Sequence, residues 1–400
     1  MEAQVPVTGS RLEAGRIGVD QDRRPAFPDG LAFVRPPVPS FERVVARLEP
    51  SYRRGQLTNG PLVRELEAAA ADRLGVAHVV AVASCTSGLM LTFRALDPAG
   101  PVVLPSFTFS ASAHAVAWVG ARPRFIECDP ATFLADLDDG RLHLEGASAL
   151  LITHIFGAPA APEEWEAVAA SARIPLVFDA AHALGSRHAG AAIGGFGDAE
   201  VFSLSPTKPV IAGEGGLVAT NRDDIAEVIR IGRDYGNPGD YDTRFVGLNA
   251  RMSELHAATA LESLAELDDH LVIRSSLAAR YRDQLADVPG IRVQVLAAGD
   301  ESTWKDFTIA VDAAEFGCTR DALVAALRAE GIDTRSYFDP PVHRQQSHAA
   351  SADRPLPITD RVASEVVSLP LYRDLDPTDL DRVVSVIADV GAGATVRSGT

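Results

Sequence analysis

One lysine in the sequence stands where a reactive amine would be useful. Lys208 lies in VFSLSPTKPVIAGEGGLVAT, residues 201–220, between a short apolar segment and a glycine-rich turn. Pro206 and Pro209 restrict the loop, and the glycines that follow allow the backbone to approach a ligand closely. A free lysine has a pKa of about 10.4, but burial or a neighbouring cation lowers that pKa enough for the amine to attack a carbonyl. The alternative is an ordinary surface lysine, and the setting favours the nucleophile.

A carboxylate follows a second apolar segment. Asp179 in FDAAH, residues 178–182, ends a predicted strand and is expected to be buried. A buried carboxylate needs a cationic or strongly donating partner, because leaving it unpaired costs several kcal/mol. The other interpretation is that Asp179 caps the next helix. His182, three residues later, is by itself typical of a core or surface histidine.

The segment SCTSG, residues 84–88, joins a predicted strand to a predicted helix. The free backbone N–H groups and the dipole at a helix start favour a phosphate. The alternative is that Ser84 or Thr86 only caps the helix. This segment therefore indicates a phosphate site only in combination with others.

Two aromatic residues follow another strand in PSFTFSAS, residues 105–112. Phe107 or Phe109 could belong to the core, or one ring could stack on a flat heteroaromatic ligand. Together, the four segments describe a ligand with a phosphate, a ring nitrogen that needs an acid, a flat face and an aldehyde. Pyridoxal 5′-phosphate has all four features, and a lysine imine with an acidic partner lets it act as an electron sink.

These residues come together only if the elements that carry them are neighbours. The pattern predicts helices at 61–75, 86–96 and 110–119 and from about 162, alternating with strands at 78–84, 101–105, 122–128, 149–155, 175–181, 199–205 and 216–220. Several strands are apolar on both faces, which predicts an α/β domain with a mostly parallel sheet flanked by helices. Ligands of such sheets bind beyond the carboxyl ends of the strands, where the residues above are placed.

The remaining chain predicts a second, smaller unit. We assign residues 1–30 to an N-terminal arm and 31–250 to the large domain, with linking helices at 251–285. Residues 286–400 contain two strand patterns, at IRVQVL and DFTIAVD, and two helical patterns, the first of which ends at Gly331. They predict a C-terminal α+β domain.

Composition excludes several classes of partner. The chain has 37 Lys and Arg against 54 Asp and Glu, a net charge of −17, which argues against nucleic acid or an anionic membrane surface. Its three cysteines form no CxxC pair and no zinc-like cluster, which is typical of reduced thiols in a cytoplasm, and we expect no metal. Charges interrupt the first 30 residues, and no segment has the roughly 20 apolar residues of a membrane span. We expect a cytoplasmic protein.

The order of these motifs resembles a known family. SCTSGLMLTFRAL, THIFGAP, VFDAAHALGS, SLSPTKPVIAGEGGLVAT and GLNARMSELHAATAL are similar to segments of the sugar aminotransferases of the DegT/DnrJ/EryC1/StrS group. These are fold-type I, pyridoxal-phosphate-dependent enzymes that aminate keto sugars carried on a nucleoside diphosphate. The resemblance runs from about residue 30 to the C-terminus, and it includes GIDTRSYFDPPVH and VVSLPLY.

The resemblance implies a role for each motif residue. Lys208 forms the imine with the cofactor, and Asp179 pairs with its pyridinium nitrogen. The other implied cofactor contacts are His182 to the ring hydroxyl, Phe109 stacked on the ring, and Cys85, Thr86, Ser203 and, from the neighbouring subunit of a homodimer, Asn249 to the phosphate. Cys85 stands where the family commonly has glycine, and His182 where many relatives have glutamine.

The implied reaction moves the amino group of glutamate to a keto sugar. The segment NARMSELHAA, residues 249–258, favours C4 of dTDP-4-keto-6-deoxyglucose, and the alternative is amination at C3 of a 3-keto sugar. Arg244, Arg335 and Tyr337 are the candidates for binding this substrate. A non-catalytic, cofactor-bound regulator is a competing class, but the chain offers no basic DNA-binding module. Lys208 argues against the dehydratases of this fold, which replace it with histidine, and no G-x-G-x-x-G indicates a dinucleotide site.

Overall fold

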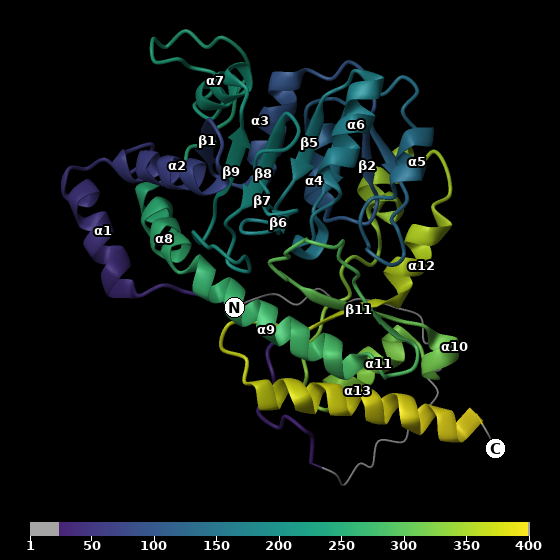
Figure 1. The fold of residues 1–400 in the computed structure, drawn as a ribbon. Coiled ribbons are helices and arrows are strands. Elements are labelled where there is room, and N and C mark those ends of the chain that lie inside the picture. The colour runs from purple at the N-terminus through teal and green to yellow at the C-terminus, as the bar shows by residue number, and fades with distance from the viewer. Residues whose placement is uncertain (1–23, 399–400) are drawn as a thin grey trace.

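The computed structural model describes residues 24–398 and contains a large and a small lobe (Figure 1). The large lobe is built on a seven-stranded sheet of order β1-β9-β8-β5-β4-β2-β3. Its strands are β1 (His78–Val82), β2 (Val102–Pro105), β3 (Pro123–Ile126), β4 (Ala149–Thr153), β5 (Leu176–Asp179), β8 (Ala199–Ser203) and β9 (Gly216–Thr220). Strand β9 pairs antiparallel with both β1 and β8, whereas β8, β5, β4, β2 and β3 run parallel to one another. The predicted mostly parallel sheet is confirmed.

Helices cover both faces of this sheet. Helices α3 (Cys85–Leu96), α4 (Ser110–Trp118) and α7 (Asp223–Gly232) pack on one face, and α2 (Pro61–Leu74), α6 (Pro162–Ala172) and α8 (Glu254–Ala265) on the other. Within β4, Leu151 contacts the first layer, while Leu150 and Ile152 contact the second. Burial of both faces explains why these strands read as continuous apolar runs.

The small lobe contains a three-stranded antiparallel sheet of order β10-β11-β12. It consists of β10 (Ile291–Val293), β11 (Phe307–Val311) and β12 (Val366–Leu369), with α9 (Leu267–Leu285), α10 (Ala313–Phe316), α11 (Arg320–Ala329) and α13 (Pro377–Ser398). Strand β12 is absent from the strands that the sequence pattern predicted, because a four-residue apolar run has no readable period.

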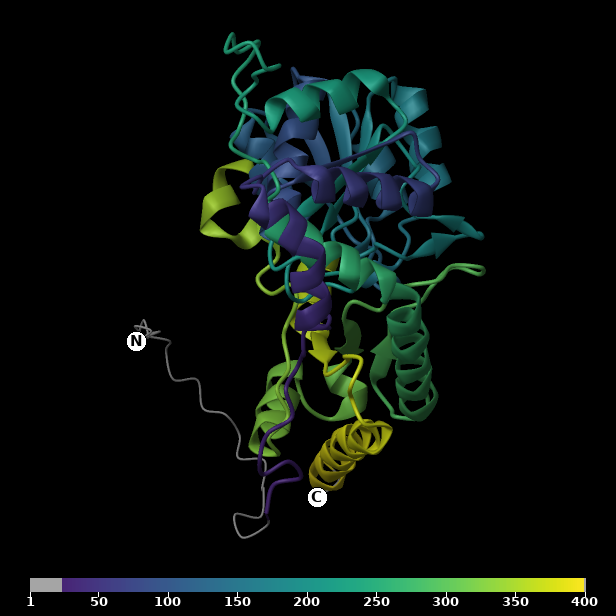
Figure 2. The ribbon, with the colours of Figure 1, turned by 90° about the vertical axis from the view of Figure 1, so that its left-hand side faces the viewer.

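The first described residues belong to the small lobe. Residues 1–23 of the expected arm lie outside the described residues. Phe27 donates its N–H to the Glu330 carbonyl at 2.9 Å, and Leu31 pairs with Ile332. Figure 2 shows this purple segment rising along the small lobe to α1 (Phe41–Arg53). The chain therefore contributes to the small-lobe core at both ends.

The remaining elements are short or peripheral. They are α5 (Leu137–Leu142), η1 (Ile155–Gly157), the hairpin β6 (Arg187–His188) with β7 (Ala191–Ala192), η2 (Val342–Arg344), η3 (Gln346–Ser351) and α12 (Pro357–Glu365). Within residues 24–398, none of the helices combines the length and the apolar character that crossing a bilayer requires.

Several predicted strands are shorter in the structure, and their ends matter for function. Strand β1 ends at Val82, so Ser84 is free to cap α3, and β5 ends at Asp179. Strand β8 ends at Ser203, five residues before Lys208. Polar side chains therefore begin where the ladder hydrogen bonds stop, at one edge of the sheet.

Candidate active site

A cavity of about 210 Å³ lies beyond these strand ends. Its lining includes Cys85, Thr86, Phe109, Asp179, His182, Ser203 and Lys208, all of them singled out in the sequence. They come from α3, the turn before α4, the last residues of β5 and β8 and the segments that follow these two strands. The parallel sheet therefore gathers residues separated by more than 100 positions into one site.

Lys208 occupies a tight turn at this cavity. Its backbone N–H donates to the carbonyl of Ser205 at 3.0 Å, and the Ser205 N–H reaches the hydroxyl of Ser203 at 3.4 Å. Burial and, second, the ammonium of Lys305 lower the pKa of Lys208 to about 8. Nearly a tenth of such amines are unprotonated at pH 7, about two hundred times more than for a lysine with its ordinary pKa. The turn thus presents a nucleophilic amine.

Asp179 is 4% exposed and accepts hydrogen bonds from uncharged donors. The Ser112 hydroxyl lies 2.6 Å from Oδ2, and the Ala181 N–H lies 3.1 Å from Oδ1. The Cys85 thiol is more distant, with Sγ 3.9 Å from Oδ1. Burial raises the pKa of Asp179, and these donors only partly oppose that effect. A cationic ring nitrogen in the cavity is the kind of partner that this carboxylate lacks.

His182 is a neutral donor to the cavity. Its Nδ1 accepts the Phe156 backbone N–H at 3.1 Å, so the ring proton is on Nε2. Burial, helped by Lys208 and Lys305, holds the pKa of His182 well below its usual value. The ring therefore offers an N–H to an anionic oxygen.

The start of α3 lies at the cavity and has the features that favour a phosphate. The Ser84 hydroxyl accepts the Ser87 N–H at 3.1 Å in a capping box. The N–H groups of Cys85 and Thr86 therefore lie at the positive end of the helix dipole. A Cβ on Gly216 would lie 2.6 Å from the Cys85 nitrogen and from the Ser84 carbonyl carbon. Glycine at 216 therefore permits β9 to approach the helix start, and Ser84 does cap α3, as the alternative interpretation held.

The structure shows which of Phe107 and Phe109 belongs to the core and which lines the cavity, a choice that the sequence left open. Phe107 is fully buried and contacts the rings of Phe133, Phe156 and Phe338, so it belongs to the core. Phe109 is 59% exposed and lines the cavity, with its ring 6.2 Å from that of Phe338. Phe109 is therefore the ring available for stacking.

Other proposed site residues lie outside the lining. Asn249 is exposed and forms a β-bridge with Asp234. Arg244 is exposed in the loop that projects beside α7 in Figure 1, paired with Asp240 at 2.6 Å and Asp242 at 3.2 Å. The cavity of one chain therefore does not contain the side chains of Asn249 and Arg244.

Arg335 and Tyr337 are the other two candidates for binding the substrate. Arg335 stacks 5.4 Å above the Phe33 ring and pairs with Asp333. Tyr337 is half-buried, and its ring centroid lies 5.4 Å from that of Phe338, which lines the cavity. Tyr337 therefore contacts a residue of the cavity wall, but neither Arg335 nor Tyr337 lines the cavity.

Sequence reasoning missed several residues at or next to the site, among them Phe338, Ser112 and Lys305. Phe338 reaches the cavity from the small lobe, Ser112 donates to Asp179, and Lys305 lies close enough to affect Lys208. The position of Ser112 in the third residue of α4, after a strand end, was the only available signal. The other two residues are more than 95 positions from Lys208 along the chain.

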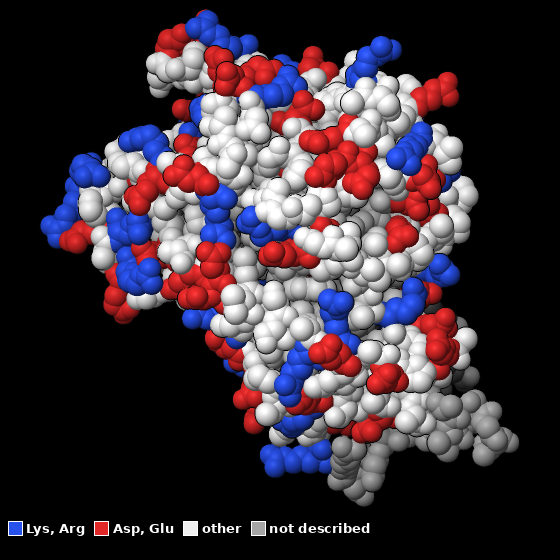
Figure 3. All heavy atoms as spheres, in the orientation of Figure 1, with Lys and Arg blue, Asp and Glu red and all other residues white. Residues whose placement is uncertain are grey.

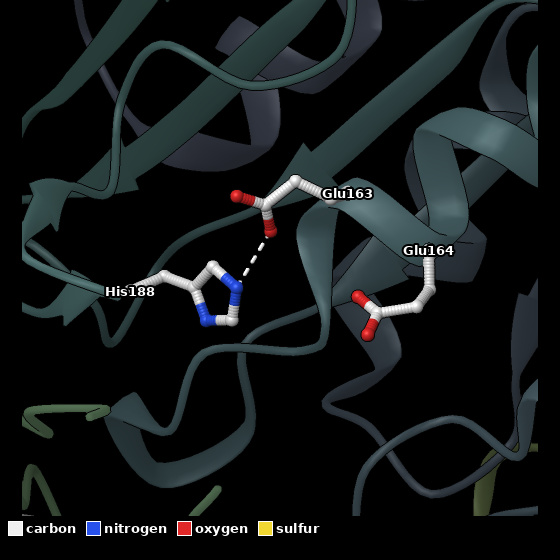
Figure 4. A group of neighbouring side chains, drawn as sticks. All are labelled: Glu163, Glu164 and His188. Atoms are coloured by element: carbon white, nitrogen blue, oxygen red, sulfur yellow. Dashed lines mark ion pairs between the residues drawn. The ribbon is translucent and has the colours of Figure 1, made fainter. Parts of the chain in front are cut away.

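A separate group of side chains resembles a metal site. Glu163, Glu164 and His188 place possible ligand atoms within 4.8 Å of one another (Figure 4). Both nitrogens of His188 are engaged, with Nε2 2.6 Å from Glu163 and Nδ1 2.6 Å from Asp300. The His188 ring thus joins α6 to the small-lobe loop that carries Asp300.

The distribution of charge on the surface is consistent with the expectation that the protein does not bind nucleic acid. On the face drawn in Figure 3, acidic and basic side chains are interspersed. Many arginines lie in ion pairs, such as Arg222 with Asp198 and Asp224. The face drawn therefore does not offer a phosphate backbone a continuous basic surface.

Fold and cavity together define a class. A lysine of lowered pKa, a buried carboxylate that forms no ion pair within residues 24–398, an imidazole N–H and a helix start fit a phosphorylated pyridine aldehyde, so the protein is a pyridoxal-phosphate-dependent enzyme of fold type I. The residues present thus fit pyridoxal 5′-phosphate.

Comparison with known proteins identifies the family. DesI, solved in the presence of its TDP-sugar product, is 36% identical with a TM-score of 0.88, over 94% of this chain and 96% of that one. DesV of S. venezuelae is 32% identical with a TM-score of 0.82, over 88% and 94%. UDP-N-acetyl-3-dehydro-alpha-D-glucosamine 3-aminotransferase of Acidithiobacillus ferrooxidans is 32% identical over 328 residues, 81% of this chain and 87% of that protein. Residues 41–388 match the family description, and the chain belongs to the DegT/DnrJ/EryC1/StrS aminotransferase family.

Proposed function

We propose that the protein transfers the amino group of glutamate to C4 of dTDP-4-keto-6-deoxyglucose. The observation that carries the transfer chemistry is the convergence of Lys208, Asp179 and His182 on one cavity at the start of α3. The similarity to DesI, whose structure holds its TDP-sugar product, supports a dTDP sugar as the substrate.

A C3 aminotransferase is the second candidate. The relative from Acidithiobacillus ferrooxidans is named for amination at C3 of a UDP sugar, and its 32% identity is close to the 36% identity of DesI. Identity of this size does not separate the two acceptors, so the product must decide between them.

Each cavity residue has a task in this reaction. Pyridoxal 5′-phosphate supplies an electron sink for the carbanion that forms when the donor loses its α-proton. Lys208 would hold the cofactor, and its free amine would move that proton as a general base. Asp179 would keep a proton on the ring nitrogen, and the Nε2–H of His182 would donate a hydrogen bond to the ring oxygen. The N–H groups of Cys85 and Thr86, with Ser203, would bind the phosphate.

We propose a homodimer in which a partner completes each site. Asn249 and Arg244 are exposed and do not line the cavity of their own chain, so in this arrangement they serve the partner. Large apolar side chains are exposed on the same loop and on α1, with Tyr241 at 95%, Val246 at 88% and Phe41 at 76% exposure. Exposed apolar side chains of this size support an interface between subunits.

The decisive experiment identifies the product. The purified enzyme, with added pyridoxal 5′-phosphate and glutamate, is incubated with dTDP-4-keto-6-deoxyglucose, and the product is examined by NMR. We expect an amine at C4 and 2-oxoglutarate as the co-product. An amine at C3, or turnover only with a UDP-linked 3-keto sugar, would instead support the second candidate.

A further inference from the structure

The sequence contains only two lysines, Lys208 and Lys305, among 35 arginines. Both belong to one site, because Lys208 lines the cavity and the backbone N–H of Lys305 donates to Phe156, whose own N–H donates to the cavity residue His182. Every other long basic side chain of the protein is arginine. Lysine differs from arginine in being compact and in changing its charge readily when buried, so its restriction to these two positions points to a shared task.

Lys305 is held firmly in the segment before β11. Its side chain is 5% exposed, and Nζ lies 2.7 Å from Oδ1 of Asp306. Nζ also lies 5.8 Å from the centre of the Tyr337 ring. Arg274, itself buried, fixes the backbone by donating to the carbonyls of Thr303 at 3.0 Å and Lys305 at 2.8 Å. The ammonium therefore has a defined position.

A short chain of contacts leads from this segment to the cavity. The Lys305 N–H donates to the Phe156 carbonyl at 2.9 Å, and the Phe156 N–H donates to Nδ1 of His182 at 3.1 Å. The Phe156 ring stacks on Phe338, with centroids 6.0 Å apart and planes 6° from parallel. His182 and Phe338 both line the cavity, so Lys305 lies directly behind its wall.

The Lys305–Asp306 pair is buried and incompletely satisfied. Oδ2 of Asp306 is buried and has no hydrogen-bond partner among the described residues, and burial of two charges carries a desolvation penalty that the ion pair has to offset. A buried pair of this kind, next to a nucleophile, is typical of a functional site. We propose that Lys305, anchored by Asp306, is a positioning residue whose fixed ammonium increases the share of Lys208 that is present as the free amine and can attack the cofactor. This inference rests on the proposed role of Lys208.

The charged groups around Lys208 determine whether each substitution should raise or lower its pKa. Lys305 opposes a proton on Lys208, whereas Asp306, Cys85 and Asp179 favour one. His182 is neutral, and Glu214 of the same loop also lines the cavity. Removing the Lys305 charge should therefore raise the pKa of Lys208. Removing the Asp306 charge as well should reverse part of that rise.

The test follows Lys208 in the full-length protein without cofactor. Lysine carrying ¹³C is incorporated biosynthetically, and because the chain has two lysines, the NMR spectrum contains two sets of lysine side-chain signals. The Lys208 signal, assigned with Lys208→Ala, is titrated in wild type, Lys305→Met, Lys305→Arg and Lys305→Met/Asp306→Asn. Thermal unfolding of each variant checks that it folds.

We expect Lys305→Met to raise the pKa of Lys208 by on the order of one unit and to slow attachment of pyridoxal phosphate at pH 7 by about tenfold. The pKa of Lys208 in Lys305→Arg should be closer to the wild-type value. In the double variant, it should lie between the values of wild type and Lys305→Met. A folded Lys305→Met with an unchanged Lys208 pKa would overturn the inference, as would a shift in Lys305→Arg equal to that in Lys305→Met. A protein that shows the shift but aminates no sugar would overturn the proposed function alone.

Discussion

The hydroxyl of Ser112 lies 2.6 Å from Oδ2 of Asp179, so helix α4 donates to the carboxylate at the end of β5. This bond crosses 67 positions of sequence and opposes the effect of burial on the pKa of Asp179. It therefore helps to keep the carboxylate ionised, which is the form that pairs with a protonated ring nitrogen.

Ser112→Ala should weaken cofactor binding. A hydrogen bond to a charged group contributes about 1.5–3 kcal/mol, so we expect the Kd for pyridoxal phosphate to rise by at least about tenfold. Fluorescence titration of the cofactor-free protein measures this Kd. Ser110→Ala, in the first residue of the same helix, is the matched control and should bind as wild type. Equal Kd values for both variants would show that Ser112 does not support Asp179.

Lys208→Ala should abolish covalent attachment of the cofactor and transamination. Wild type treated with pyridoxal phosphate and borohydride should carry one added cofactor group, which peptide mass spectrometry should locate at Lys208 and not at Lys305. The variant should carry none. A Lys208→Ala protein that still aminates a keto sugar would refute the assigned nucleophile.

Attachment of pyridoxal phosphate to wild type should depend on pH through Lys208. Only the unprotonated amine attacks an aldehyde, and the pKa of Lys208 is lowered to about 8, by burial first and by Lys305 second. Below pH 8 the rate should therefore rise about tenfold per pH unit, and above it the rate should level off. Stopped-flow absorbance measures this profile. A rate that keeps rising to pH 10 would mean that Lys208 has its ordinary pKa.

Gly216→Ala should damage the proposed phosphate site at the start of α3. The added Cβ would meet backbone atoms of Ser84 and Cys85 at 2.6 Å, so either α3 or β9 must move, at a cost of about 1–3 kcal/mol. We expect a lower urea midpoint and weaker binding of pyridoxal phosphate, with less effect on pyridoxal, which has no phosphate. Gly195→Ala, whose Cβ would meet only Val76 at 3.6 Å, is the control and should retain both affinities.

Tyr241→Glu combined with Val246→Glu should disrupt the proposed homodimer. Both side chains are nearly fully exposed, so the change should leave the fold of the single chain intact. Analytical ultracentrifugation should show dimers for wild type and monomers for the variant, with lower activity if Asn249 serves the partner. A wild-type chain that sediments as a monomer would contradict the shared site.

Much of the architecture could be predicted because it depends on local pattern. The helix at 61–75 appears as α2 and stops at Gly75, whose φ of 68° suits glycine. The direction of each strand was harder to predict, because the residues of β9, which is antiparallel to β1 and β8, resemble those of the parallel strands. Five predicted strands end two residues too late, because the residue types at the ends of segments such as VVAVAS and LLITHI do not mark where the ladder hydrogen bonds stop.

The kinds of side chain at the site can be predicted from local sequence: a lysine in a restrained loop, an acid at the end of a strand and small polar residues at a helix start. These predictions depend only on residues that are close together in the sequence, and local propensities are sufficient to make them. Three relations emerge only from the folded chain: Phe109 and not Phe107 lines the cavity, Ser112 donates to Asp179, and Lys305 lies behind the cavity wall. Those relations join residues far apart in the chain, and burial and charge act through space, so only packing of the lobes establishes them.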